Sequence, residues 1–397
     1  MQPMQTLAHE KLAAVLLCTR TPVDGETSKQ ILAFARSEPE WEALLAAANE
    51  HSLMAVFCRN LAACAGEALP SLWRQRFNEE FLRNSCRNLA STAELFRLLE
   101  AFEGHGVCAT PYKGPVLAAQ AYCDVALRQF ADLDIMIPQR QIPAAHDALV
   151  GLGFRALIPG LIRGRESAES RRQIPGQYAY CKEPETMVEL HTEFTLRYFP
   201  RGLNLGELCK RRGPATVGGR QVLTFSREDT LLLLSVHGSK HFWERLGWIA
   251  DIAALAKGSP AMDWALALER ARRWGVHRMM LLGAGLAAQL YETPLPNEVA
   301  ERLKRDGIAR RLMEEICQRY RRFFAGEAEQ LGVFSRFAFR VRMRGSLAQG
   351  VPYAVRLAMM PTELDRGRHA HHLEPVYALL RPLRLARTYG WRTRAGR

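Results

Sequence analysis

Asp132 and Asp134 form a D-x-D motif, and their type and spacing suggest chemistry more directly than any other residues of this chain. They lie within residues 130–138, where apolar side chains alternate from Leu133 onward, which predicts a strand. Residues two apart on a strand point to the same side, and two carboxylates that close are unfavourable without a cation between them. Hard oxygen ligands suit Mg²⁺ or Mn²⁺. We therefore predict a divalent metal site here, although a D-x-D motif alone is also common on solvent-facing strands.

A third carboxylate is predicted on a later strand, residues 187–191, where Glu189 has apolar neighbours on both sides. If the two strands pair, three carboxylates can hold two metal ions that clamp a triphosphate. Glu193 points to the same side as Glu189, so periodicity does not choose between them. Glu189 is preferred because it lies in mid-strand. His191 shares this face and is expected only to orient Glu189.

A turn suited to phosphate binding precedes the D-x-D motif. Lys113, Gly114 and Pro115 separate a short apolar segment from a predicted helix. Glycine lets the backbone approach a phosphate, a helix N-terminus offers free amides, and Lys113 adds a positive charge. Arg128, four residues before the D-x-D motif, is predicted either to contact phosphate or to form a surface salt bridge. The chain contains neither G-x-x-x-x-G-K-[ST] nor G-x-G-x-x-G, which excludes a P-loop and a classical dinucleotide fingerprint.

Two histidines, His237 and His241, are spaced to share one face of a predicted helix. They are candidates for a wall of the site that contacts phosphate or an acceptor; the alternative is simple packing between helices. A zinc site is excluded because the H-E-x-x-H glutamate and a third ligand are missing. Arg245 is a further phosphate candidate, and we expect it to pair with Asp251 and fix this helix.

Hydrophobic periodicity predicts an α+β fold in which a small mixed sheet is flanked by N-terminal and C-terminal helical regions. The expected domains are a helical region at 1–103, an α/β core at 104–225, a helical domain at 226–334 and an arginine-rich helical segment at 335–397. Strands are expected near residues 107–112, 130–138, 153–158, 178–181 and 187–191, with a loop at 159–173.

The basic charge of the chain is concentrated at its C-terminal end. The whole chain has 54 Lys and Arg against 41 Asp and Glu, a net charge of +13. Residues 335–397 contain 13 Arg, no Lys and three acids, which is +10 of that total. Large apolar side chains accompany these arginines, so we expect residues 335–390 to fold back as helices. The alternatives are contact with nucleic acid or with an anionic membrane surface.

Composition excludes several other classes of protein. Apolar residues make up 48% of the chain and charged residues 24%, unlike a disordered chain. The nine cysteines are odd in number and include no C-x-x-C, so neither a disulfide framework nor a zinc site is predicted. No signal peptide and no run of about 18 apolar residues is present, and a cytoplasmic location is expected.

Three segments together resemble one known family. They read YKGPVLAAQAYCDVALRQFADLDIMIP, MVELHTEF and EDTLLLLSVHGSKHFWERLGWIADIAAL. This pattern, with a similar ending in PTELDRGRHAHHLEPVYALLRPLRLARTYG, is similar to the uncharacterised nucleotidyltransferase family of bacteria, within the DNA polymerase β-like superfamily. The resemblance implies a nucleotidyltransferase core, matches Gly114 to the glycine turn, and matches Asp132, Asp134 and Glu189 to the metal triad. Pro115 and the 17 residues between Gly114 and Asp132 depart from the superfamily pattern.

The resemblance implies an enzyme that uses Mg²⁺ or Mn²⁺ to move a nucleoside monophosphate from a nucleoside triphosphate, with ATP expected, to an acceptor hydroxyl. The acceptor, a sugar, another small molecule or a protein, is not encoded in any motif, and neither is the oligomeric state. Nucleic acid is not expected as a partner, and peripheral membrane contact is left open. The alternatives are a catalytically idle binding or assembly module with this fold, and a binder of nucleic acid or anionic surfaces through the basic tail.

Overall fold

A computed structural model describes residues 2–157, 176–183, 186–192, 205–258, 261–327 and 330–359 of the protein. The predicted loop at 159–173 therefore lies outside the described residues, as does Glu193. None of the described helices has the length and hydropathy that a membrane span requires.

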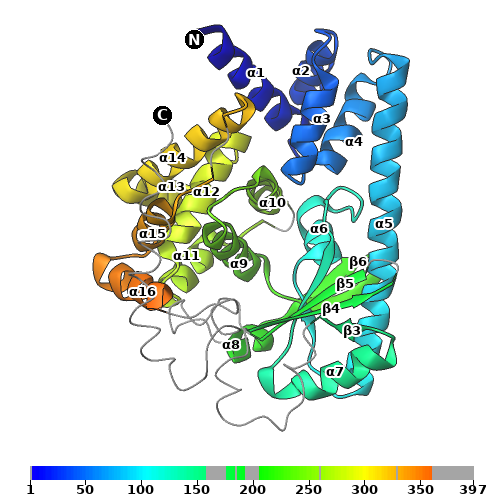
Figure 1. Cartoon of the computed structure of the whole chain (residues 1–397), viewed down its shortest axis with the longest axis vertical. Helices are drawn as coiled ribbons and strands as arrows, with labels where there is room; N and C mark the ends of the chain where they lie inside the picture. The colour runs from blue at the N-terminus through cyan, green and yellow to red at the C-terminus, as the bar shows by residue number, and fades with distance from the viewer. Residues whose placement is uncertain are drawn as a thin grey trace, which may run out of the picture.

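The N-terminal region consists of helices, as its apolar period predicted. They are α1 (Gln2–Cys18), α2 (Gly25–Ala35), α3 (Trp41–Glu50), α4 (Met54–Ala65) and α5 (Ser71–Gly104). The α2 helix begins where the side chain of Asp24 accepts a hydrogen bond from the Thr27 amide at 2.7 Å. With 34 residues, α5 is about 50 Å long and runs from the N-terminal helices down along the sheet (Figure 1).

The core contains a mixed five-stranded sheet of order β1-β2-β5-β4-β3. Its strands are β1 (Thr110–Pro111), β2 (Asp132–Met136), β3 (Arg155–Ala156), β4 (Gln177–Lys182) and β5 (Thr186–His191). All five predicted strands are present, although β1 and β3 are only two residues long. The central pair, β2 and β5, is parallel and the other pairs are antiparallel.

The two faces of the sheet differ in chemistry because side chains alternate along each strand. One face supplies Leu133, Ile135 and Val188 to an apolar cluster that also contains residues of α5 and of α7 (Ile142–Gly151), which follows the short η1 helix (Gln139–Gln141). The opposite face carries the acidic residues. The α6 helix (Gly114–Tyr122) connects β1 to the loop before β2.

A second, two-stranded sheet was not predicted. After α8 (Leu205–Lys210), β6 (Gly213–Val217) and β7 (Arg220–Thr224) form an antiparallel hairpin. Its turn is Gly218-Gly219, and both glycines have positive φ, 53° and 81°. A glycine pair between two short β-prone segments is a hairpin signal, so the sequence did contain the information for this element.

A helical region follows, with α9 (Arg227–Lys240), α10 (Leu246–Lys257), α11 (Trp264–Arg273), α12 (His277–Tyr291), α13 (Asn297–Arg305) and α14 (Gly307–Phe324). The hydrophobic period over 297–325 predicts one helix, but the structure has two, divided at Asp306. The Asp306 side chain accepts hydrogen bonds from the amides of Ile308 and Ala309 and so caps α14. These helices and the N-terminal ones share a single apolar core, which includes Val15 and Leu282.

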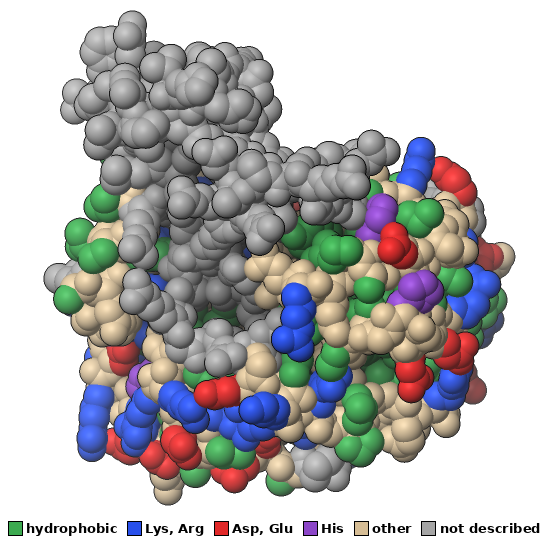
Figure 2. All heavy atoms as spheres, turned by 90° about the horizontal axis from the view of Figure 1, so that it is seen from below, with side chains coloured by type: hydrophobic (Ala, Val, Ile, Leu, Met, Phe, Trp, Pro, Cys, Tyr) green, Lys and Arg blue, Asp and Glu red, His purple; other side chains and the backbone are tan. Residues whose placement is uncertain are grey.

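The basic C-terminal segment begins as packed helix. The helices α15 (Val333–Arg342) and α16 (Leu347–Met359) bury Phe339, Met343 and Tyr353. Residues 360–397 lie outside the described residues. On the face shown in Figure 2, Lys and Arg side chains of the described residues are interspersed with Asp and Glu side chains. This face therefore shows no extended patch of one charge that would suit nucleic acid.

Candidate active site

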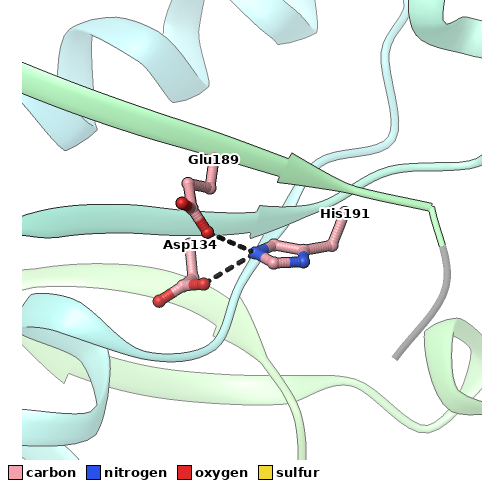
Figure 3. Close-up of side chains that lie close together, drawn as sticks. All are labelled: Asp134, Glu189 and His191. Carbon is pink, nitrogen blue, oxygen red and sulfur yellow. Dashed lines mark hydrogen bonds and ion pairs between the residues drawn. The ribbon is translucent and has the colours of Figure 1, made fainter. Parts of the chain in front are cut away.

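The parallel register of β2 and β5 brings the acidic residues together. Asp134 is opposite Glu189, and Met136 is opposite His191. The side chains of Asp134, Glu189 and His191 converge (Figure 3), and one ligand atom from each lies within 4.8 Å of the others. His191 Nε2 is 2.7 Å from Asp134 Oδ1 and 3.5 Å from Glu189 Oε2. Gln177 on β4 donates a hydrogen bond to the same oxygen, Glu189 Oε2.

The charges of this cluster are only partly compensated. Burial alone would raise the pKa of Asp134, but the Lys113 ammonium, 3.1 Å away, and the hydrogen bond from His191 hold it well below its usual range. Burial and then the neighbouring charge of Asp134 raise the pKa of Asp132. Burial would lower the pKa of His191, yet its hydrogen bonds to Asp134 and Glu189 raise it. The carboxylates of Asp132, Asp134 and Glu189 thus have one lysine, Lys113, and one histidine, His191, as their basic groups in direct contact.

These residues fit a divalent cation. Oxygen ligands of an octahedral ion at about 2.1 Å lie about 3 Å from each other, which is the scale of the spacings in this cluster. Two carboxylates and an imidazole suit Mn²⁺ as well as Mg²⁺. Asp132 lies on the same face, two residues along β2 and opposite Met187. Among the described residues, the group of possible ligands within 4.8 Å of one another contains Asp134, Glu189 and His191 and does not include Asp132. Sequence reasoning treated His191 as an orienting group; the E-x-H spacing was the signal for it.

The glycine turn is tightly built against β2. Gly114 has φ +53°, and a Cβ atom there would lie 3.2 Å from the Asp132 carbonyl oxygen, so the position requires glycine. Lys113 precedes it and directs its ammonium to Asp134. Pro115 has no amide, and the Val116 amide already donates to the Lys113 carbonyl at 3.2 Å. Among these first residues of α6, only Gly114 has an amide to offer to a phosphate.

Arg128 lies in a buried ion pair. Its Nε is 3.0 and 3.1 Å from the two carboxylate oxygens of Asp251 on α10, and Tyr122 donates to the same carboxylate at 3.0 Å. The expected pairing of Asp251 with Arg245 is wrong, because the buried Arg128 reaches this carboxylate first. Arg245 is exposed and donates to Ser52 Oγ at 3.2 Å.

The loop that carries Arg128 is fixed from α5. The Asn84 amide donates to the Ala126 carbonyl at 2.8 Å, and the Asn88 amide donates to the Val125 and Arg128 carbonyls at 2.7 Å. These contacts hold the backbone just before the D-x-D motif. Arg128 also lies within electrostatic range of Asp132, where its charge partly opposes the rise that burial and Asp134 cause in the pKa of that carboxyl.

The imidazole rings of His237 and His241 lie next to each other on one side of the site, tilted at 53°. Their ring centroids are 4.7 Å apart, and Trp248 packs at 5.1 Å from His237 and 5.4 Å from His241. Burial, followed by the charge of Lys113, lowers the pKa of His237 well below its usual value. Burial lowers the pKa of His241 to about 4. Both imidazoles are therefore neutral at neutral pH and near Lys113.

The site thus combines neighbouring parallel strands that carry a D-x-D motif and a glutamate in register with a glycine turn that opens a helix. A family model described as uncharacterised nucleotidyltransferase matches residues 37–292, more than half of the chain. The chain belongs to that family and is a nucleotidyltransferase.

Comparison with solved structures gives two structures of one protein, ANT(2'')-Ia. The solution structure of the antibiotic-resistance factor ANT(2'')-Ia is 13% identical, with 59% of this chain and 94% of that chain covered and a TM-score of 0.29. The crystal structure of ANT(2")-Ia in complex with adenylyl-2"-tobramycin is 13% identical, with 58% and 99% covered and a TM-score of 0.27. Both likenesses are weak. Comparison with curated proteins gave no match.

Proposed function

We propose that the protein transfers a nucleoside monophosphate from a nucleoside triphosphate, with ATP as the expected donor, to a hydroxyl group of an acceptor, and that the reaction needs Mg²⁺ or Mn²⁺. The convergence of Asp134, Glu189 and His191 within 4.8 Å, beside Asp132, is the observation that carries this proposal. The family supports nucleotidyl transfer in general.

Asp132, Asp134 and Glu189 would hold the metal, and His191 would either join them or fix the orientation of Asp134. A bound divalent ion would neutralise charge on the triphosphate and lower the pKa of the attacking hydroxyl. Lys113 and the Gly114 amide would contact phosphate oxygens. Arg128, His237, His241 and Arg245 are further proposed contacts; Arg128 would act mainly by fixing the loop before Asp132.

The transfer itself forms one bond and breaks one. The acceptor oxygen attacks the α-phosphorus while the bond from that phosphorus to the bridging oxygen breaks, and pyrophosphate leaves with the electron pair. In this proposal Glu189 would accept the proton of the acceptor hydroxyl. Its carboxylate, unlike that of Asp134, is only partly buried, with 23% of its side chain exposed. An incoming acceptor can therefore reach it.

The test is incubation of the protein with each of four α-³²P-labelled nucleoside triphosphates, Mg²⁺ or Mn²⁺, and a bacterial cell extract as the source of acceptors. Transfer of label to one chemical class, a sugar, another small molecule or a protein, supports the proposal and identifies the acceptor class. Asp132→Asn and Asp134→Asn should lose this transfer. Label transfer that persists in the double variant would refute the assignment of the site.

A catalytically idle binding module is the second candidate, and one observation favours it. The Lys113 ammonium already lies 3.1 Å from Asp134, where it neutralises part of the charge that would attract a metal. This candidate predicts metal-dependent triphosphate binding without release of pyrophosphate. Continuous measurement of pyrophosphate in the same incubations separates the two functions.

A further inference from the structure

Two cations that form no ion pair among the described residues, Lys240 and Arg340, lie near the acidic cluster. Lys240, in the last turn of α9, is partly buried and forms no ion pair or hydrogen bond within the described ranges of the chain. It lies within electrostatic range of Lys113, Glu189 and Asp134. It also follows His237 by three residues, which places the two side chains on the same face of the helix.

A second cation comes from the C-terminal segment. Arg336 and Arg340, four residues apart on α15, both lie over the ring of Phe242, with their Cζ atoms 5.3 and 5.0 Å from its centroid. Arg336 also faces Glu244 at 3.8 Å. Arg340 is partly buried, and among the described residues it faces no carboxylate. Its position next to Phe242 brings it to the end of α9.

His241 lies in the middle of these cations. After burial, the largest influences that lower its pKa are the charges of Lys240, Lys113, Arg245 and Arg340. The ring is therefore neutral and can donate one hydrogen bond and accept another. Partly buried charges of one sign without a counter-ion are unfavourable, so their persistence points to a ligand that supplies the opposite charge.

We propose that Lys240, His241 and Arg340 form an anion site that binds the β- and γ-phosphates of the triphosphate donor and holds the pyrophosphate as it leaves. The position of this site beside the metal cluster rests on the proposed function. Lys113 joins the two, because it contacts Asp134 and lies within electrostatic range of Lys240 and His241. Negative charge accumulates on pyrophosphate as it leaves, and fixed cations there stabilise the transition state.

The proposal gives the C-terminal segment a role in the site. The family match ends at residue 292, whereas Arg340 lies in α15, beyond it. The α15 helix is held in place by Phe339, which is buried and packs against Phe242 with ring centroids 5.4 Å apart. A residue outside the matched core would thus complete the phosphate site.

The test is the binding of inorganic tripolyphosphate in EDTA, measured by isothermal titration calorimetry, so that no metal takes part. We expect Lys240→Gln and Arg340→Gln each to weaken binding about tenfold, as loss of one charged contact does. Arg342→Gln is the matched control, because Arg342 lies on the same helix, is partly exposed like Arg340 and already pairs with Glu315 at 2.5 and 2.8 Å. It should bind within twofold of the unchanged protein.

Equal binding by Lys240→Gln, Arg340→Gln and the unchanged protein would overturn the anion site, as would an equal loss in Arg342→Gln. Lys240→Arg keeps the charge and should restore binding, which a purely structural role of the lysine would not require. Asp134→Asn should bind tripolyphosphate at least as tightly, because it removes a negative charge. If the unchanged protein transfers no label but its tripolyphosphate binding depends on Lys240, the proposed function is rejected and the anion site is kept. If it transfers label but its tripolyphosphate binding does not depend on Lys240, the anion site alone is rejected.

Discussion

Two buried aspartates of this protein, Asp251 and Asp134, have almost the same exposure but opposite charge balance. Asp251 is 3% exposed and Asp134 is 4% exposed. Asp251 receives the Arg128 guanidinium on both oxygens and a hydrogen bond from Tyr122. One negative charge meets one positive charge, and both oxygens have partners.

Asp134 is surrounded differently. It contacts Lys113 and His191, but Asp132 and Glu189 lie close by, so the acidic groups outnumber the one lysine that is in direct contact with Asp134. Removal of one partner from a balanced buried ion pair leaves an uncompensated charge and destabilises the fold, whereas buried charge in surplus is typical of functional sites. We therefore propose that Asp251 is structural and Asp134 functional, a distinction that burial alone does not make.

The largest expected effect is on transfer by Asp134→Asn. Removing one ligand of the site should lower the rate of labelled nucleotide transfer by about 10³-fold, which corresponds to about 4 kcal/mol. The fold should remain, because the substitution relieves repulsion from Asp132. The rate is measured with saturating triphosphate and Mn²⁺, and circular dichroism checks the fold. An unchanged rate would remove the distinction between the two aspartates.

Asp251→Asn should lower the stability of the fold, whereas Asp134→Asn lowers the transfer rate. It leaves the Arg128 guanidinium buried without a counter-ion, and the free energy of unfolding should fall by about 3–5 kcal/mol. The measurement is urea unfolding followed by tryptophan fluorescence. The double variant Arg128→Met/Asp251→Leu, which buries no charge, should recover much of this loss. A single variant as stable as the parent protein would contradict the structural role.

His191→Gln tests whether the imidazole of His191 contributes to metal binding by the acidic cluster. Removing a group that either ligates the metal or orients its carboxylate should weaken Mn²⁺ binding about 10–100-fold. His146→Gln is the control, because His146 lies on α7 and contacts Tyr180 at 3.2 Å. Binding is followed by the loss of the free Mn²⁺ signal in electron paramagnetic resonance. Equal affinities of the two variants would show that His191 takes no part.

Gly114→Ala should have the smallest effect. The left-handed backbone at this position costs an alanine about 1–2 kcal/mol, and its Cβ would press on the Asp132 carbonyl at 3.2 Å. Gly104→Ala is the matched control, because a Cβ there meets nothing within 4 Å. Thermal unfolding of the two variants measures the difference. A loss of stability at Gly104 equal to that at Gly114 would argue against a strained turn.

The acidic cluster was predictable from the sequence to the extent that it depends on short-range periodicity. Alternation placed Asp132 and Asp134 on one face of β2 and Glu189 on one face of β5. The parallel register that sets Asp134 opposite Glu189 is a long-range property, and the prediction had to assume it. The choice of Glu189 over Glu193 stays a prediction, since Glu193 lies outside the described residues.

Contacts between distant segments were not predictable in the same way. Arg128 and Asp251 are 123 residues apart in the chain, and their pairing depends on how α10 packs against α6. Sequence reasoning instead paired Asp251 with its near neighbour Arg245. Lys240 was missed because a lysine at the end of a helix usually faces solvent, whereas in the fold it is partly buried near Lys113 and Asp134.

The central claim is that the cluster around Asp134 binds a divalent cation and that the pair around Asp251 does not. Mn²⁺ titration, followed by electron paramagnetic resonance at a temperature where every variant is folded, tests this directly. The account predicts that Asp134→Asn loses at least tenfold in Mn²⁺ affinity while Asp251→Asn binds like the unchanged protein. Binding by Asp134→Asn that equals the unchanged protein, or an equal loss in Asp251→Asn, would contradict it.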